Sequence, residues 1–158
     1  MNIINDRKLA RRFRDGEVSE KEQLIYFLIL TTIYSVLATT YINQVFYDTV
    51  TNWDIAIDAS VIVITFVGTL FVFNTNAKGD SKDFIARYIC LSFPVIIQVV
   101  LLTLMIAVSL YIADELTSRE LITYETNTLD WALVSFVTIV AFLRLNGAIK
   151  IASSGPTD

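Results

Sequence analysis

Four long apolar segments limit what this chain can fold into more than any other feature of its sequence. They cover residues 24–46, 55–73, 88–112 and 129–149, and charged residues are rare within them. A transmembrane helix needs about 20 mostly apolar residues to cross roughly 30 Å of hydrocarbon. The sequence therefore predicts an all-α membrane protein with four transmembrane helices in an antiparallel bundle.

The composition points to the same fold class. Of the 158 residues, 54% are hydrophobic and 18% are charged, whereas about a quarter of the residues in a typical soluble domain are charged. A chain of this length has room for one membrane domain, which we place at residues 19–151. An N-terminal helix at residues 1–18 and a flexible tail at residues 152–158 complete the predicted organisation.

The positions of the basic residues predict how the spans are oriented. Of the 12 Lys and Arg residues, six precede the first apolar segment, three lie in or beside the loop at residues 74–87, and two lie near the end of the fourth segment. Short loops rich in Lys and Arg stay on the cytoplasmic side. We therefore expect both termini and this loop to face the cytoplasm, in the inner membrane of a bacterium.

The N-terminal segment has the pattern of an amphipathic helix that ends near Gly16. Leu9, Ala10 and Phe13 fall on one side of a helical wheel, which Asp6 interrupts, and the basic residues fall on the other. This pattern is typical of a helix in the membrane interface near anionic lipid. The predicted membrane-surface residues are Arg7, Lys8, Arg11, Arg12, Phe13 and Arg14. The alternative is a solvated charged tail that only sets the orientation of the spans.

The second and fourth segments begin with similar residues. Residues 51–54 read TNWD and residues 126–131 read TNTLDW. Both segments have the same predicted direction across the membrane, as a parallel repeat of two spans requires. The ordinary preference of Trp and Asn for membrane interfaces is the alternative explanation.

Arg144 is the charged residue that lies deepest in a predicted span, about 20 Å along the helix axis from Trp131 at the outer interface. An unpaired charge at such a depth costs about 3 kcal/mol on insertion scales. The side chain therefore either reaches the headgroups or pairs with an acid, and the nearest acids on the cytoplasmic side belong to the 74–87 loop. The predicted structural network consists of Asp80, Asp83, Arg87 and Arg144. It would pin the fourth span to the third.

Four polar residues are candidates for a ligand or ion pathway, namely Asp54, Asp58, Gln98 and Arg144. Asp54 and Asp58 are one helical turn apart and so lie on one face. Their spacing resembles part of a motif of lipid-headgroup transferases, although the glycines and the Ala-Arg pair of that motif are absent. They also belong to eight acids on the predicted outer side, where Arg119 is the single base, and such a surface concentrates cations. For Gln98, the alternative is a hydrogen bond to another helix.

The sequence lacks the residue patterns of the common enzyme classes. It has no histidine, no glycine-rich phosphate loop and no metal-binding cluster, and its one cysteine, Cys90, is expected to be a buried, inert thiol. Membrane topology accounts for the basic residues, which leaves no pattern for nucleic-acid binding. We therefore predict a non-catalytic membrane module, without cofactor or metal, that binds a membrane protein partner or further copies of itself. The alternatives are an oligomeric channel or small-solute transporter with an acidic outer vestibule and, second, an enzyme that acts on lipid.

Overall fold

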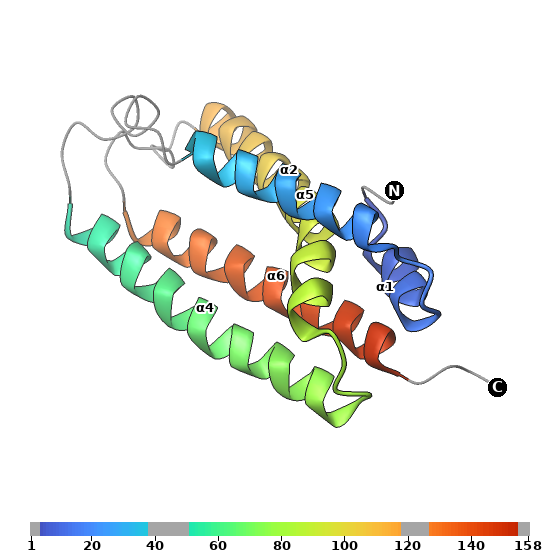
Figure 1. Cartoon of the computed structure of the whole chain (residues 1–158). Helices are drawn as coiled ribbons and strands as arrows, with labels where there is room; N and C mark the ends of the chain where they lie inside the picture. The colour runs from blue at the N-terminus through green and yellow to red at the C-terminus, as the bar shows by residue number, and fades with distance from the viewer. Residues whose placement is uncertain (1–3, 38–50, 118–126, 155–158) are drawn as a thin grey trace.

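The computed structural model describes residues 4–37, 51–117 and 127–154, and the regular elements in these ranges are all α-helices (Figure 1). They are α1 (Asp6–Arg14), α2 (Glu20–Leu37), α4 (Asn52–Lys78), α5 (Phe84–Thr117) and α6 (Thr128–Ser153). Within this part of the chain, three helices, α4, α5 and α6, are long and apolar enough to cross a membrane. The predicted span 24–46 coincides with α2 up to Leu37, and its later residues lie outside the described ranges.

α4 and α6 begin with the same local structure. At the start of α4, the Asp54 N–H donates to the Thr51 hydroxyl at 3.2 Å, and the Thr51 N–H donates to the Asp54 carboxylate at 2.7 Å. Asn127 and Asp130 make the equivalent reciprocal pair at the start of α6, at 3.4 and 3.0 Å. Each pair satisfies N–H groups that the first helical turn leaves without partners.

The helices pack as two pairs, and the two helices of each pair run in the same direction. α4 makes its most extensive contact with α6, and α2 lies along α5 (Figure 1). α5 also contacts α6 and so joins the pairs, whereas α2 and α4 make little or no contact over the described residues. Consecutive spans alternate in direction, and α5 and α6 are antiparallel neighbours, as predicted. The packing differs from the predicted antiparallel bundle because the most extensive contact, between α4 and α6, joins two parallel helices.

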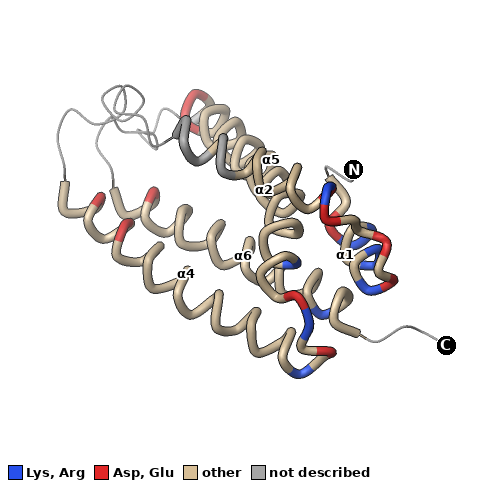
Figure 2. The backbone as a smooth tube through the Cα atoms, viewed as in Figure 1, with Lys and Arg blue, Asp and Glu red and all other residues tan. Residues whose placement is uncertain are grey.

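The packed core lies at one end of the helices. This end carries α1, the turn between α4 and α5, the last turns of α6 and the described Lys and Arg residues, and we call it the basic end (Figure 2). The acidic end holds the first turns of α4 and α6 and the last turns of α5. The buried apolar residues of the described ranges are Leu9, Ala10, Phe13, Val18, Tyr26, Val72, Cys90, Leu91, Phe93, Val95, Leu145, Ala148, Ile149 and Ala152. All of them lie toward the basic end.

The apolar side of α1 packs against protein. Leu9 and Ala10 have no exposed surface, and Phe13 is 8% exposed, because α1 contacts both α5 and α6. This corrects the prediction that the apolar side, including Phe13, inserts into the membrane interface, since burial against α5 and α6 removes the same apolar surface from water. α1 ends at Arg14, two residues before the predicted glycine, Gly16, whose φ of +72° is a conformation that glycine adopts without a Cβ penalty. Three basic residues stay exposed on the other side: Arg7, Lys8 and Arg11.

Candidate functional site

Arg87 is the centre of a polar cluster at the basic end. Its side chain is 4% exposed, and its guanidinium donates to both carboxylate oxygens of Asp80 at 2.5 and 2.6 Å. It also donates to the side-chain oxygen of Asn76 at 3.1 Å. The hydrogen bonds from Arg87 hold the pKa of Asp80 below its ordinary value of 3.8, because they favour the charged carboxylate. The buried arginine is therefore neutralised by a direct partner.

The turn between α4 and α5 holds Asp80 in place. Asn76 donates from its amide to the Lys82 carbonyl at 3.2 Å, and the Lys82 N–H donates to the Asp80 carboxylate at 3.1 Å. The Asp80 N–H donates to the Ser153 carbonyl at 3.0 Å, which attaches the turn to the end of α6. Gly79 allows this approach, because a Cβ at that position would lie 2.5 Å from the Ser153 side chain. The turn thus links α4, α5 and α6.

Arg144 belongs to a second cluster, between α1, α5 and α6. Its guanidinium donates to the side-chain oxygen of Gln98 and lies 3.4 Å from Oδ1 of Asp6. Gln98 in turn donates to the same Asp6 oxygen at 3.2 Å and to the Ile4 carbonyl at 2.5 Å. Asp6 is 4% exposed, so two donors meet a carboxylate that is removed from water. This cluster attaches the start of α1 to α5 and α6.

The predicted pairing of Arg144 with Asp80 or Asp83 is therefore wrong. α1 lies against α6 and brings Asp6 to the level of Arg144. The turn that carries Asp80 packs beside Ser153, which is about 13 Å further along the axis of α6. A side chain of arginine length does not cover that distance. The predicted network is instead an Asp80–Arg87 pair and a separate Arg144 cluster.

Asp83 contributes its backbone, whereas its side chain is exposed. It directly precedes α5, where its carbonyl accepts the Arg87 N–H at 3.0 Å. Its φ of +46° lies in the left-handed region, so the chain changes direction here before the helix begins. The one-turn spacing of Asp83 and Arg87 predicts a side-chain pair only if both residues are inside the helix, and Asp83 is not.

A third ion pair joins α1 to α2. Arg12 donates to both carboxylate oxygens of Glu22 at 2.7 Å, and these hydrogen bonds lower the pKa of Glu22 from its ordinary value of 4.5. The sequence did not predict this pair. Arg12 and Glu22 belong to different helices, so their separation along the chain does not indicate that they are in contact. Arg14, another predicted membrane-surface residue, pairs with the neighbouring Asp15 at 2.9 Å.

The four candidate pathway residues do not meet in one place. Gln98 and Arg144 share the cluster around Asp6, whereas Asp54 caps α4 at the acidic end and Asp58 is exposed one turn later. A cavity of about 360 Å³ lies between α2, α4, α5 and α6, and none of the four residues lines it. No charged side chain is among its lining residues. Its polar groups are the hydroxyls of Thr65, Tyr88, Ser92 and Thr138.

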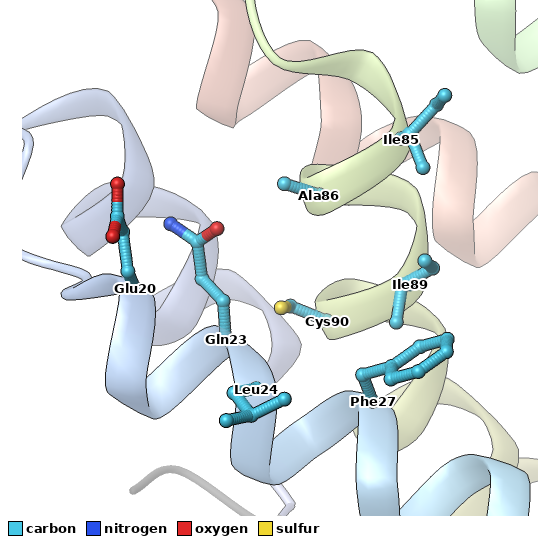
Figure 3. A pocket seen from close by; sticks show the side chains of 8 residues that line it. All are labelled: Glu20, Gln23, Leu24, Phe27, Ile85, Ala86, Ile89 and Cys90. Atoms are coloured by element: carbon cyan, nitrogen blue, oxygen red, sulfur yellow. The ribbon is translucent and has the colours of Figure 1, made fainter.

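Cys90 lies beside a pocket of about 430 Å³ between α2 and α5 (Figure 3). The sulfur points toward α2, where Gln23 and Leu24 face it. Cys90 is 1% exposed and forms no disulfide. The predicted burial of this thiol is therefore confirmed.

Comparison with known proteins gives no assignment, since no protein family, characterised protein or solved structure matches this chain. Among the residues that the structure describes, no three His, Cys, Asp or Glu side chains form a group able to hold a metal ion. The distribution of packing and charge is therefore the basis for assigning a function.

We expect Arg144 and Asp6 to be coupled in stability. Arg144→Gln and Asp6→Asn should each lower the free energy of unfolding in detergent, because each change weakens the hydrogen bonds of a buried group. The double substitution should lose about 1 kcal/mol less than the sum of the single changes, as is usual for residues in contact. Arg11→Gln, which removes an exposed charge from α1, should combine additively with Asp6→Asn. Additivity of Arg144→Gln and Asp6→Asn would show that Arg144 interacts mainly with solvent or headgroups.

Proposed function

We propose that this chain is a non-catalytic integral membrane protein that assembles with further copies of itself through the acidic-end half of α5. The observation that carries the proposal is the uneven packing of the described helices. The buried residues begin at Gly68 in α4 and at Leu145 in α6, and in α5, which runs the other way, they end at Val95, so all of them lie toward the basic end. In the acidic-end halves of these three helices, many large apolar side chains are exposed and none is buried by the residues that the structure describes. The basic end is the part of each copy that packs within the single chain.

The acidic-end half of α5 carries a surface suited to close helix contact. Thr103 and Ala107 are four residues apart, and Ala107 is exposed. Small residues at this spacing let helices approach each other closely in membranes. Three large apolar side chains next to Ala107 on the same side of the helix, those of Val100, Leu104 and Tyr111, are each at least half exposed. We define the α5 face as Val100, Leu104, Ala107 and Tyr111.

A comparable pair of small residues on α4 is already engaged within the chain. Ser60, four residues after Ala56, accepts a hydrogen bond from the Trp131 indole at 2.8 Å. This contact belongs to the α4–α6 pair, whereas the small residue Ala107 on the α5 face is exposed in the described structure and available to a second copy. The lack of charged groups in the lining of the central cavity favours assembly over ion conduction.

The proposal includes an orientation. The described Lys and Arg residues gather at the basic end, and acidic residues mark the other end (Figure 2). By the preference of basic residues for the cytoplasmic side, the basic end faces the cytoplasm. The α5 face then lies in the outer half of a cytoplasmic membrane.

Cysteine crosslinking in native membranes tests the assembly. On a Cys90→Ser background, Leu104→Cys should form a disulfide-linked dimer under mild oxidation, because a symmetric interface brings equivalent positions together. Met105→Cys is the matched control, since it is also exposed but lies about 100° around α5, and it should stay monomeric. Adding Ala107→Leu should reduce the Leu104→Cys dimer several-fold, whereas adding Ser109→Leu on the other side of the helix should not.

Two results would contradict the proposal. Equal crosslinking at Leu104→Cys and Met105→Cys would indicate random collisions between copies. A strictly monomeric particle in mild detergent, together with no crosslinked dimer in membranes, would leave the α5 face as a surface for lipid alone.

A further inference from the structure

The surface shared by α4 and α6 carries two adjacent pockets of different character. The first, of about 290 Å³, is lined by apolar residues that include Val63, Val67, Ile139 and Leu143. The second, of about 430 Å³, lies nearer the basic end, and its polar lining includes Thr75, Lys78, Asn146, Lys150 and Ser154. Phe71 lines both pockets. The two pockets therefore adjoin at Phe71 on the surface between the helices, and we call them together the groove, which is apolar on the side of Val63 and basic on the side of Lys150.

The same change of character occurs along each helix. Lys78 follows Val67 by eleven residues on α4, and Lys150 follows Ile139 by eleven residues on α6. Eleven residues are close to three helical turns, so each lysine lies on the same face as the apolar residue before it. Because α4 and α6 are parallel and side by side (Figure 1), the two lysines come together at the basic end.

The polar pocket has positive charge that no acidic side chain among the described residues neutralises. Lys78 and Lys150 are exposed, and neither forms an ion pair with any residue that the structure describes. No acidic side chain lines this pocket. By contrast, Arg12, Arg87 and Arg144 at the same end each have a carboxylate partner.

We propose that this groove binds an anionic phospholipid. Its phosphate lies between Lys78 and Lys150, where two ammonium groups complement the negative charge. An acyl chain follows the apolar pocket between α4 and α6. The continuity of the basic and apolar pockets favours a phospholipid over a soluble phosphate compound. The site is separate from the basic side of α1.

Lipid titration of the full chain in mild detergent, read by native mass spectrometry, tests the charged end of the groove. Phosphatidylglycerol should bind in preference to phosphatidylcholine, which has the same chains and no net charge. Lys78→Gln with Lys150→Gln should weaken phosphatidylglycerol binding by roughly twenty-five-fold, from about fivefold per lysine near a membrane surface. Lys21→Gln with Lys82→Gln is the matched control, because both lysines are exposed and lie outside the pocket. This control variant should change phosphatidylglycerol binding by less than about twofold.

The apolar end is tested separately. Val67→Trp fills the chain groove and should weaken phosphatidylglycerol binding by about tenfold, an effect in the range expected for lost chain contacts. Val108→Trp, on the exposed surface of α5, is the matched control and should have no effect. Glycerol 3-phosphate should not compete with the lipid. Three results would overturn the proposal. The first is that the two lysine double variants lose phosphatidylglycerol binding equally, and the second is that the Lys78→Gln, Lys150→Gln variant binds as the wild type does. The third is full competition by glycerol 3-phosphate.

Discussion

Asp80→Asn should lower the free energy of unfolding by about 3 kcal/mol. The asparagine keeps an oxygen that accepts the Lys82 N–H, but it removes the negative charge that faces Arg87. Arg87 is 4% exposed and does not lose its proton, so the change leaves an unneutralised charge in the core. Such losses are about 3–5 kcal/mol, and we expect the lower end because Asp80 itself is 25% exposed. Unfolding in mixed micelles containing dodecyl sulfate measures the difference.

Asp83→Asn is the matched control, three residues away. Its side chain is exposed, and asparagine tolerates a left-handed φ, so we expect a change of less than about 0.5 kcal/mol. A loss equal to that of Asp80→Asn would show that Asp83 is a partner of Arg87 after all.

Acid should act on the same ion pair. The pKa of Asp80 lies below its ordinary value of 3.8, so the pair contributes its full stability above that value. The contribution is lost as the pH falls through the lowered pKa. Below about pH 4, the wild-type protein should therefore lose stability more steeply than Asp80→Asn. If the free energy of unfolding fell with pH in the same way in both proteins, Arg87 would not be stabilising the Asp80 carboxylate.

Gly68→Ala should destabilise the protein by about 1–3 kcal/mol, the usual cost of overpacking in a well-packed region. A Cβ at this position would overlap the ring of Phe142, with the ring atom nearest the backbone, Cγ, closest of all. That atom moves only if the side chain changes rotamer or if α4 and α6 separate. Thermal unfolding in detergent would measure the loss.

Gly147→Ala makes the same chemical change on α6 as a control. No atom lies within 4 Å of the added methyl group, and alanine is the better helix former by up to about 1 kcal/mol. This variant should be as stable as the wild type or slightly more stable. If Gly68→Ala behaved in the same way, the Phe142 ring would have moved into one of the two pockets that it lines.

The features that the sequence predicted well are local ones. The apolar runs at 55–73, 88–112 and 129–149 lie within α4, α5 and α6, because length and hydrophobicity identify a membrane-length helix without reference to its neighbours. The end of α1 two residues before Gly16 also follows from a single residue type. The distribution of charged residues along the chain predicted two ends of opposite net charge. Among the described residues, Lys and Arg lie at the basic end together with several acids, whereas the acidic end carries acids alone (Figure 2).

The tertiary structure alone decided which surfaces meet. An amphipathic pattern shows that the apolar side of α1 leaves water, but it is the same pattern whether lipid or α5 and α6 cover that side. In the same way, the depth of Arg144 indicated either a partner or a side chain that reaches the headgroups, but not that Asp6, 138 positions away, would be the partner. Hydrophobicity and charge are properties of one residue in its own helix, whereas a contact depends on where two helices lie relative to each other.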